Sequence, residues 1–302
     1  MSVPAAYLGV ILIWTTTPLA IQWSGQGSGF LFGVTARMVI GVMLALALVA
    51  LLRLPMAWHK RAWQTYLAAG IGIYAAMLIV YWSAQFIPSG WISVIFGLTP
   101  VITGVMATLW LGERALTPLK LLGMGLGLIG LAVIFSTGWH VSEMAWLGVA
   151  GVFTSVVLHS LSTVLVKRIG YQANGLVITT GGLLVAVPLY LLTWFLSDAH
   201  WPAAVSPRGG ASIVYLGVVG SVLGFAMFYY VLRHVSATRV ALLTLITPVN
   251  ALWLGHVLNG ESVGPSVIAG TLLILSGLGL FEWGARRRAG FGVAPLSVEE
   301  PR

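Results

Sequence analysis

The sequence contains no cysteine and few charged residues. None of its 302 residues is cysteine, which excludes disulfide bonds and thiolate metal sites. Asp, Glu, Lys and Arg together account for only 7% of the chain, whereas about 25% is usual in soluble domains. Apolar residues account for 59% of the chain, more than a soluble globule of this length can bury. The composition therefore excludes an ordinary soluble protein.

The apolar residues are grouped in ten segments, each long enough as a helix to cross the roughly 30 Å hydrocarbon core of a membrane. No Lys or Arg precedes the first segment, so we interpret it as a retained helix and not as a cleaved signal. We therefore predict an all-α membrane protein with ten transmembrane helices. The predicted spans are residues 3–22, 30–52, 64–86, 89–111, 118–136, 145–166, 174–196, 212–232, 240–258 and 265–285.

The net charge of +8 is distributed unevenly over the two sides of this arrangement. Thirteen of the fifteen Lys and Arg residues fall in loops or in the tail on one side, Arg208 falls on the other, and Arg37 lies inside a span. Since cytoplasmic loops are enriched in Lys and Arg, we expect both termini in the cytoplasm and the protein in the cytoplasmic (inner) membrane. The basic residues form no stripe, so we expect no nucleic-acid partner.

The sequence LTPVITGVMATLWLGE of residues 98–113 returns as ITPVNALWLGHVLNGE in residues 246–261, 148 positions later. We infer a first five-helix repeat in residues 1–137, a second in residues 145–286, and a disordered cytoplasmic tail in residues 287–302. Five is an odd number, so the second repeat begins on the opposite side of the membrane and is inverted. Consistently, the loop at 87–91 is uncharged, whereas its counterpart at 233–239 carries two arginines. Inverted repeats are typical of secondary transporters.

These repeated motifs resemble the EamA-type domain of the drug/metabolite transporter superfamily. The resemblance rests on Pro100 to Glu113 followed by the glycines of 123–130, and on Pro248 to Glu261 followed by the glycines of 270–279. Trp14 and Arg37 also match, and the similarity extends over about residues 7–283. It implies a ten-helix carrier, often an exporter of amino acids and related metabolites. It further implies a central cavity lined by helices one to four and six to nine.

Pro100 and Pro248 each remove a backbone donor and clash with the carbonyl four residues back, so we predict a kink in each helix. The kinked helices either gate or line the cavity, or serve packing alone. Thr99 and Thr247 can return a hydroxyl to the freed carbonyls. Glu113 and Glu261 end their spans near water. Their expected role is to cap backbone N–H groups or to pair with a loop base.

Arg37 lies about eight residues into a span, where a charge is costly and needs a polar environment. No acidic residue is expected at the same depth. The guanidinium therefore either holds helix-end carbonyls or binds a substrate carboxylate. His159 is the histidine near mid-depth of a span. It either carries a coupling proton or is a neutral side chain bonded to a neighbouring hydroxyl.

Aromatic residues are the best candidates for the walls of the cavity. Tyr74 and Tyr81 are seven apart and share one face of a helix, and Tyr229 is the repeat mate of Tyr81. An apolar chamber with few polar groups is typical of small-molecule sites. The complete set of predicted substrate-binding residues is Trp14, Arg37, Tyr74, Tyr81, Phe96, His159, Tyr229, Asn250 and Trp253, with Pro100 and Pro248 as gating residues.

We therefore expect a transporter that exports a small neutral or zwitterionic metabolite, in the first place an amino acid or a related compound. The alternative is a carrier of lipids, isoprenoids or drug-like solutes with the same fold. An enzyme that uses His159 with a serine is disfavoured, because no orienting acid and no nucleophile elbow accompany them. We expect no catalytic residue, metal or cofactor. The expected partners are a small-molecule substrate and membrane lipid, and the chain is either a monomer or a homodimer.

Overall fold

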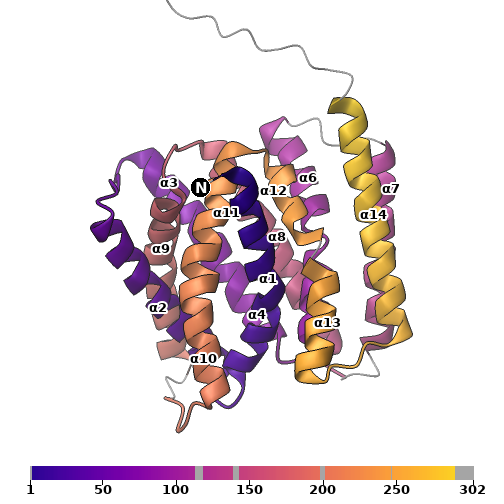
Figure 1. The fold of residues 1–302 in the computed structure, drawn as a ribbon, viewed down its shortest axis with the longest axis horizontal. Coiled ribbons are helices and arrows are strands. Elements are labelled where there is room, and N and C mark those ends of the chain that lie inside the picture. The colour runs from indigo at the N-terminus through magenta and orange to yellow at the C-terminus, as the bar shows by residue number, and fades with distance from the viewer. Residues whose placement is uncertain (1, 113–117, 139–142, 198–200, 246, 290–302) are drawn as a thin grey trace, which may run out of the picture.

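The computed structural model describes residues 2–112, 118–138, 143–197, 201–245 and 247–289. These residues form helices joined by short loops, and no strand occurs among them (Figure 1). The elements in chain order are α1 (Val3–Gly25), α2 (Phe30–Leu51), α3 (Lys60–Gly70), the π-helix η1 (Ile71–Ala76), α4 (Met77–Ser83), α5 (Ser89–Phe96), α6 (Thr99–Leu111), α7 (Pro118–Gly138), α8 (Ala145–Ile169), α9 (Gly175–Leu196), α10 (Pro207–Tyr215), the π-helix η2 (Leu216–Gly224), α11 (Phe225–His234), α12 (Ala237–Ala241), the 3-10 helix η3 (Leu242–Leu245), α13 (Thr247–Asn259) and α14 (Pro265–Ala289).

Within the described ranges, seven helical runs are long and apolar enough to cross a membrane. They coincide with seven of the predicted spans and confirm a helical integral membrane protein. Apolar stretches in α7 and α14 are shorter, and the segment predicted as the ninth span is divided into α12, η3 and α13. The seven runs are Val3–Gly25, Phe30–Leu51, Lys60–Ser83, Ser89–Leu111, Ala145–Ile169, Gly175–Leu196 and Pro207–His234.

The kink predicted at Pro100 is confirmed, because α5 and α6 are separated only by Gly97 and Leu98, which keep right-handed helical dihedrals. At Pro248 the interruption before α13 includes residue 246, which lies outside the described residues. α5 ends at Phe96, and α6 begins at Thr99 with Pro100 in its first turn, where a missing N–H costs least. The Thr99 hydroxyl donates to the Phe96 carbonyl over 2.5 Å. In the second half, the Thr247 hydroxyl donates to the Thr244 carbonyl over 3.2 Å. Both threonines thus return a donor to the carbonyl that the proline leaves free, as the sequence predicted.

Two π-helices interrupt spans in the two halves. η1 covers Ile71–Ala76, which corresponds at the offset of 148 residues to 219–224, the second part of η2. The Tyr190 hydroxyl lies 2.8 Å from the Ile73 carbonyl oxygen and 3.0 Å from that of Tyr74. The wider π-helical turn changes the pairing of these backbone carbonyls, and the Tyr190 hydroxyl supplies a donor for them. A carbonyl inside the membrane needs such a partner.

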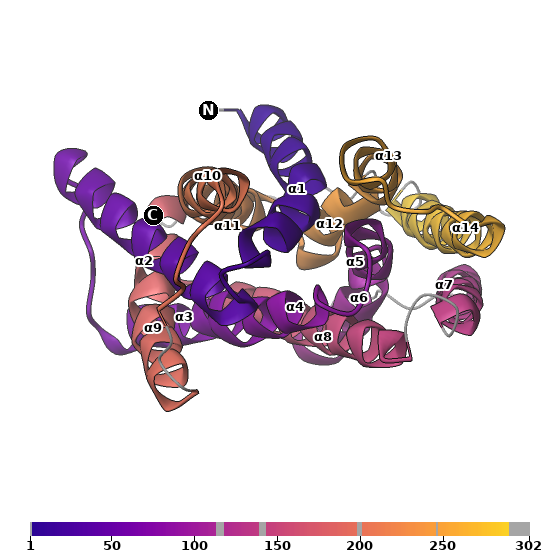
Figure 2. The ribbon, with the colours of Figure 1, turned by 90° about the horizontal axis from the view of Figure 1, so that it is seen from below.

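The interrupted helices of the two halves pack side by side and run in opposite directions. α5 contacts α13, and α6 contacts α12, so the first part of one helix lies beside the second part of the other. Figure 1 shows α12 and α6 together at the top and α13 at the bottom, and Figure 2 shows α5 beside α13 from below. The two interruptions meet, because a Cβ on Gly97 would lie 3.6 Å from Cγ of Pro248.

α7 and α14 pack mainly on each other and stand at one edge of the molecule (Figures 1 and 2). Gly123 and Gly277 make this approach possible, since a Cβ on either would meet backbone atoms of the opposite helix. Gly123 and Gly127 lie four residues apart, and both face residues of the same chain, since a Cβ on Gly127 would meet Leu98.

The start of α1 and the end of α14 lie on the same side of the molecule, at the top of Figure 1. We call this side the basic face, because the ends of helices there carry basic residues such as Lys60, Arg168 and Arg233. The opposite side, with Arg208, is the charge-poor face. On the basic face, the Lys167 ammonium donates to the carbonyl of Leu232 (2.7 Å), in the last turn of α11, and to that of Val235 (2.8 Å), just after it.

A polar network ties the two halves together on the charge-poor face. One Glu261 oxygen accepts from the amide (3.0 Å) and hydroxyl (2.6 Å) of Ser89, and the other accepts from the Gly90 amide (3.1 Å). The carboxylate, beyond α13, thus caps the first turn of α5, as predicted for a helix N-terminus. Asn259 donates both to Glu261 and to the Gln22 side chain, and its oxygen accepts from the Trp23 indole. Glu113, the repeat mate of Glu261, lies outside the described residues.

Candidate functional site

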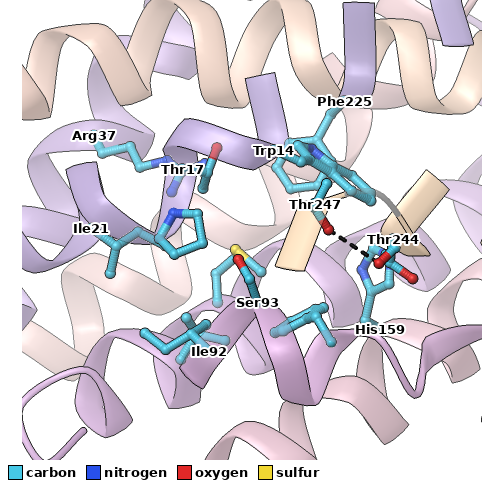
Figure 3. A pocket seen from close by; sticks show the side chains of 14 residues that line it. Trp14, Thr17, Ile21, Arg37, Ile92, Ser93, His159, Phe225, Thr244 and Thr247 are labelled. Carbon is cyan, nitrogen blue, oxygen red and sulfur yellow. Dashed lines mark hydrogen bonds between the residues drawn. The ribbon is translucent and has the colours of Figure 1, made fainter. Parts of the chain in front are cut away.

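A small pocket lies where the interrupted helices meet α1, the end of α2 nearer the charge-poor face, α4, α8 and α11. Its volume is about 60 Å³, enough for a few water molecules but too small for an amino acid. Figure 3 shows Arg37 and Ile21 at one end of this central pocket and His159 and Thr244 at the other. Its walls are formed by Trp14, Thr17, Pro18, Ile21, Arg37, Met77, Val80, Ile92, Ser93, Phe96, His159, Phe225, Thr244 and Thr247.

Arg37 is 1% exposed, and its recorded partners in the described part of the chain are neutral. Nε donates to the Ser221 hydroxyl over 2.8 Å, and Nη1 donates to the Tyr81 hydroxyl over 3.3 Å. The guanidinium carbon lies 5.9 Å from the centre of the Tyr81 ring. Hydroxyls and a ring face orient the cation but do not neutralise it. A buried charge with neutral partners is costly, and an opposite charge in the pocket would offset that cost.

Glycines make room for the Arg37 side chain between α2 and η2. A Cβ on Gly220 would lie 3.1 Å from Nη2 of Arg37, and a Cβ on Gly41 would lie 3.1 Å from Cβ of Ser221. η2 therefore approaches α2 closely enough for Ser221 to reach the guanidinium. This close approach explains why the π-helix of the second half carries glycines where it faces Arg37.

His159 lies at the other end of the pocket within an aromatic cluster. Its ring centroid is 5.6 Å from that of Trp14, 5.3 Å from Phe228 and 6.2 Å from Phe96. Among the described residues, Nδ1 has no hydrogen-bond partner, although the side chain is buried. The Thr163 hydroxyl instead donates to the His159 carbonyl. The expectation that a neighbouring hydroxyl bonds the imidazole is therefore wrong for Nδ1.

The polar groups at the centre of the pocket come from the interrupted helices. Ser93 and Phe96 belong to α5, and Thr244 and Thr247 flank the interruption between η3 and α13. Phe96 and Thr244 occupy the same position of the two repeats, 148 residues apart. Discontinuous helices at corresponding positions of two halves are typical of substrate sites in transporters.

The structure brings together four of the nine predicted substrate-binding residues, namely Trp14, Arg37, Phe96 and His159. Tyr81 borders this group through its bond to Arg37. Tyr74 lies elsewhere, with its hydroxyl 2.6 Å from that of Thr193. Tyr229 is buried against Phe225 and Phe228 and does not line the pocket. The predicted gating residues Pro100 and Pro248 lie at the helix interruptions and are not among the lining residues.

The prediction that Asn250 and Trp253 line the cavity is wrong. Both side chains are exposed on α13, Trp253 by 64%, and neither lines the pocket. The 3-10 turn of η3, with three residues per turn, changes the helical phase ahead of α13. The face on which a residue of α13 lies therefore cannot be found by counting helical turns from the residues before η3.

Sequence reasoning missed the contribution of α1 beyond Trp14, and it missed Ser221. Thr17 and Pro18 line the pocket, and the run TTTP at residues 15–18 was an available signal of a proline inside a span. No sequence signal indicates Ser221, because 184 residues separate it from Arg37. In the ranges that the structure describes, no group of three His, Cys, Asp or Glu side chains could hold a metal ion.

A pocket inside a helical membrane protein, where two interrupted helices cross, is typical of membrane transport proteins. The model of the EamA-like transporter family matches residues 3–136 and, separately, residues 146–282. The chain therefore belongs to the EamA-like transporter family. The resemblance to the EamA domain noted in the sequence is confirmed.

Individual relatives support this assignment. The chain is 27% identical to an uncharacterized transporter of Bacillus subtilis, over 89% of this chain and 88% of the other. It is 27% identical to a probable terminal-alkyne amino-acid exporter of Streptantibioticus cattleyicolor, over 92% and 96%. It is 25% identical to an S-adenosylmethionine/S-adenosylhomocysteine transporter of Chlamydia muridarum, over 85% and 84%. A solved crystal structure shares the fold with a TM-score of 0.69 at 20% identity, covering 95% of this chain and 99% of that one.

Proposed function

We propose that the protein is a secondary transporter of ten spans that exports a small neutral or zwitterionic metabolite, in the first place an amino acid or a related compound. The observation that carries this proposal is Arg37, a buried cation with neutral partners, at the wall of an enclosed pocket. A substrate carboxylate would complete its coordination, and two parallel N–H···O bonds would fix the orientation of the substrate.

The remaining walls suit the other parts of such a substrate. The faces of Trp14, Phe96 and Phe225 attract an ammonium group or pack against an apolar side chain. Ser93, Thr244 and Thr247 offer hydroxyls without charge. Two relatives are named for compatible substrates, one an amino-acid exporter and the other a transporter of S-adenosylmethionine and S-adenosylhomocysteine.

We further propose that the two family segments are inverted five-helix repeats that exchange conformations in alternating access. The antiparallel packing of α5–α6 against α12–α13 and the corresponding positions of the π-helices support this arrangement. The central pocket is small, and contacts of Lys167 on the basic face and of Glu261 on the charge-poor face join helices on both sides of it. These features suit an intermediate of the transport cycle that is closed on both sides. The basic face would be cytoplasmic, in the inner membrane.

Transport by the purified protein in lipid vesicles tests the proposal. Vesicles loaded with unlabelled amino acids should take up radiolabelled amino acids by exchange, whereas vesicles without protein should not. Arg37→Gln should reduce the exchange of carboxylate-containing substrates at least about tenfold, the loss expected for a charged hydrogen bond. Arg208→Gln is the matched control, because Arg208 lies on the charge-poor face against Trp23. Equal exchange by both variants would contradict the role of Arg37.

A further inference from the structure

A second hollow opens on the charge-poor face, between the end of α1, the start of α2 and the end of α4. Its volume is about 230 Å³. Gln26 and Gln85 are exposed, whereas Tyr81 is 1% exposed, so the hollow leads from an accessible rim to a buried tyrosine. We call it the glutamine vestibule, and its lining residues are Ile21, Gln22, Gly25, Gln26, Phe30, Tyr81, Ala84 and Gln85.

One layer of side chains separates the vestibule from the central pocket. Ile21 lines both spaces. Tyr81 lines the vestibule, Arg37 lines the central pocket, and the hydrogen bond of 3.3 Å between them closes the remainder of the partition. Ile21 and Arg37 lie at the same end of the central pocket, away from His159 (Figure 3).

The other end of the central pocket is closed more heavily. There the rings of Trp14, His159 and Phe228 pack against one another, with centroids 5.2 to 5.6 Å apart. These rings come from α1, α8 and α11, so opening in this direction requires three packed rings to separate. The route through the Tyr81 partition requires the displacement of side chains only.

We propose that the glutamine vestibule is a second substrate subsite on the path of export, and that Tyr81 is the gate between it and the central pocket. This inference rests on the proposed transport function. Amide groups donate and accept hydrogen bonds without charge, so the vestibule suits the polar end of a zwitterion and holds it weakly. A carboxylate bonds a guanidinium more strongly than a neutral hydroxyl does. A substrate that reaches Arg37 therefore displaces the Tyr81 hydroxyl and releases the gate.

Cysteine labelling tests the gate directly, because the natural chain has no cysteine. Gln85→Cys reports on the vestibule and Ser93→Cys on the central pocket. In right-side-out membrane vesicles, a membrane-impermeant thiol reagent should modify the cysteine at 85 rapidly and that at 93 slowly. Adding Tyr81→Ala should accelerate modification at 93 about fivefold or more, since about fivefold corresponds to one hydrogen bond of average strength. Modification at 85 should stay unchanged, which also verifies folding.

Tyr74→Ala is the matched control, because Tyr74 lies in the same span, also bonds a hydroxyl, and lines neither space. It should leave the rate at 93 unchanged. Tyr81→Phe keeps the ring and its packing but loses the hydrogen bond. It should therefore accelerate modification at 93 less than Tyr81→Ala does. The proposal is overturned if the cysteine at 85 is protected, or if neither Tyr81 variant accelerates modification at 93. These rates need no substrate, so vesicles that show the gate but exchange no amino acid would refute the transport function alone.

Discussion

Ser221 orients Arg37 through a bond of 2.8 Å to Nε, which leaves the other guanidinium nitrogens directed elsewhere. It lies in η2, on the opposite half of the chain. The orientation of the only intramembrane arginine predicted from the sequence therefore depends on a π-helix that no sequence pattern indicated. Arg37 and Ser221 form one unit, in which the serine positions and the arginine binds.

Ser221→Ala should raise the apparent KM for a carboxylate substrate about tenfold and change kcat little, because a hydrogen bond to a charged group is lost. Ser83→Ala is the control. Ser83 is equally buried, but its hydroxyl has no partner within the described portion of the chain. That variant should keep its KM and its thermal stability. Initial rates of exchange in vesicles give the KM of each variant. An equal KM for the two variants would contradict the positioning role.

At the level of side chains, the sequence located the centre of the site better than its periphery. Arg37 and His159 were found because each is a polar side chain deep in a span, and Trp14 and Phe96 because aromatic residues were expected in the walls. Asn250 and Trp253 lie on the exposed side of α13, which their depth in the span did not indicate.

Among the helices, α5 depends on a residue of the other half to pair the backbone amides of its first turn. The Glu261 carboxylate satisfies two amides and one hydroxyl at its first turn, and it also accepts from Asn259. A carboxylate has enough lone pairs for these four donors, whereas a carboxamide has one oxygen and adds donors of its own.

Glu261→Gln should therefore lower the temperature of thermal unfolding by roughly 3–10 °C, which follows from a loss of about 1.5–3 kcal/mol. Glu143→Gln, at an exposed carboxylate before α8, should leave it unchanged. Fluorescence-detected unfolding in detergent makes the comparison. Identical curves for the two variants would show that the cap contributes no stability.

The contact of α7 with α14 gives a second test. Gly123→Leu should prevent the close approach and destabilise the pair by about 1–3 kcal/mol, because the added side chain meets the backbone of α14. Gly125→Leu is the matched control, since nothing lies within 4 Å of a Cβ at that position. Thermal unfolding and the yield of monodisperse protein should fall for the first variant only. A similar loss for both would indicate that leucine itself is the cause.

The order and the apolar character of the helices were predictable, because hydrophobic length and the repeat are visible in the sequence. The local conformation of the backbone within the helices was not predictable. A kink was predicted at Pro100, whereas the 3-10 helix η3 before α13 was not predicted. The π-helices were also unexpected, because one additional residue in a turn leaves no mark in an apolar sequence.

For the molecule as a whole, the two faces differ in charge and the two interrupted helices run in opposite directions. The domain boundaries and the cytoplasmic placement of the termini remain predictions from the sequence. Of the predicted tail at 287–302, the structure describes residues 287–289, which end α14.

Single cysteines in the cysteine-free chain test this topology. Arg208→Cys should react with an impermeant reagent in right-side-out vesicles, whereas Lys60→Cys and Arg168→Cys should react only after the membrane is opened. The reason is that Lys60 and Arg168 lie on the basic face, which is expected to be cytoplasmic. Reaction of the cysteine at position 60 in sealed vesicles would reverse the orientation.

The capping of α5 by Glu261 also concerns biosynthesis. The ribosome completes α5 more than 160 residues before it reaches Glu261, since the capped Ser89 and the carboxylate are 172 positions apart. The nascent first half therefore enters the bilayer with these amides unpaired and with only water or lipid headgroups to solvate them. Final assembly of that half has to wait until translation is almost finished.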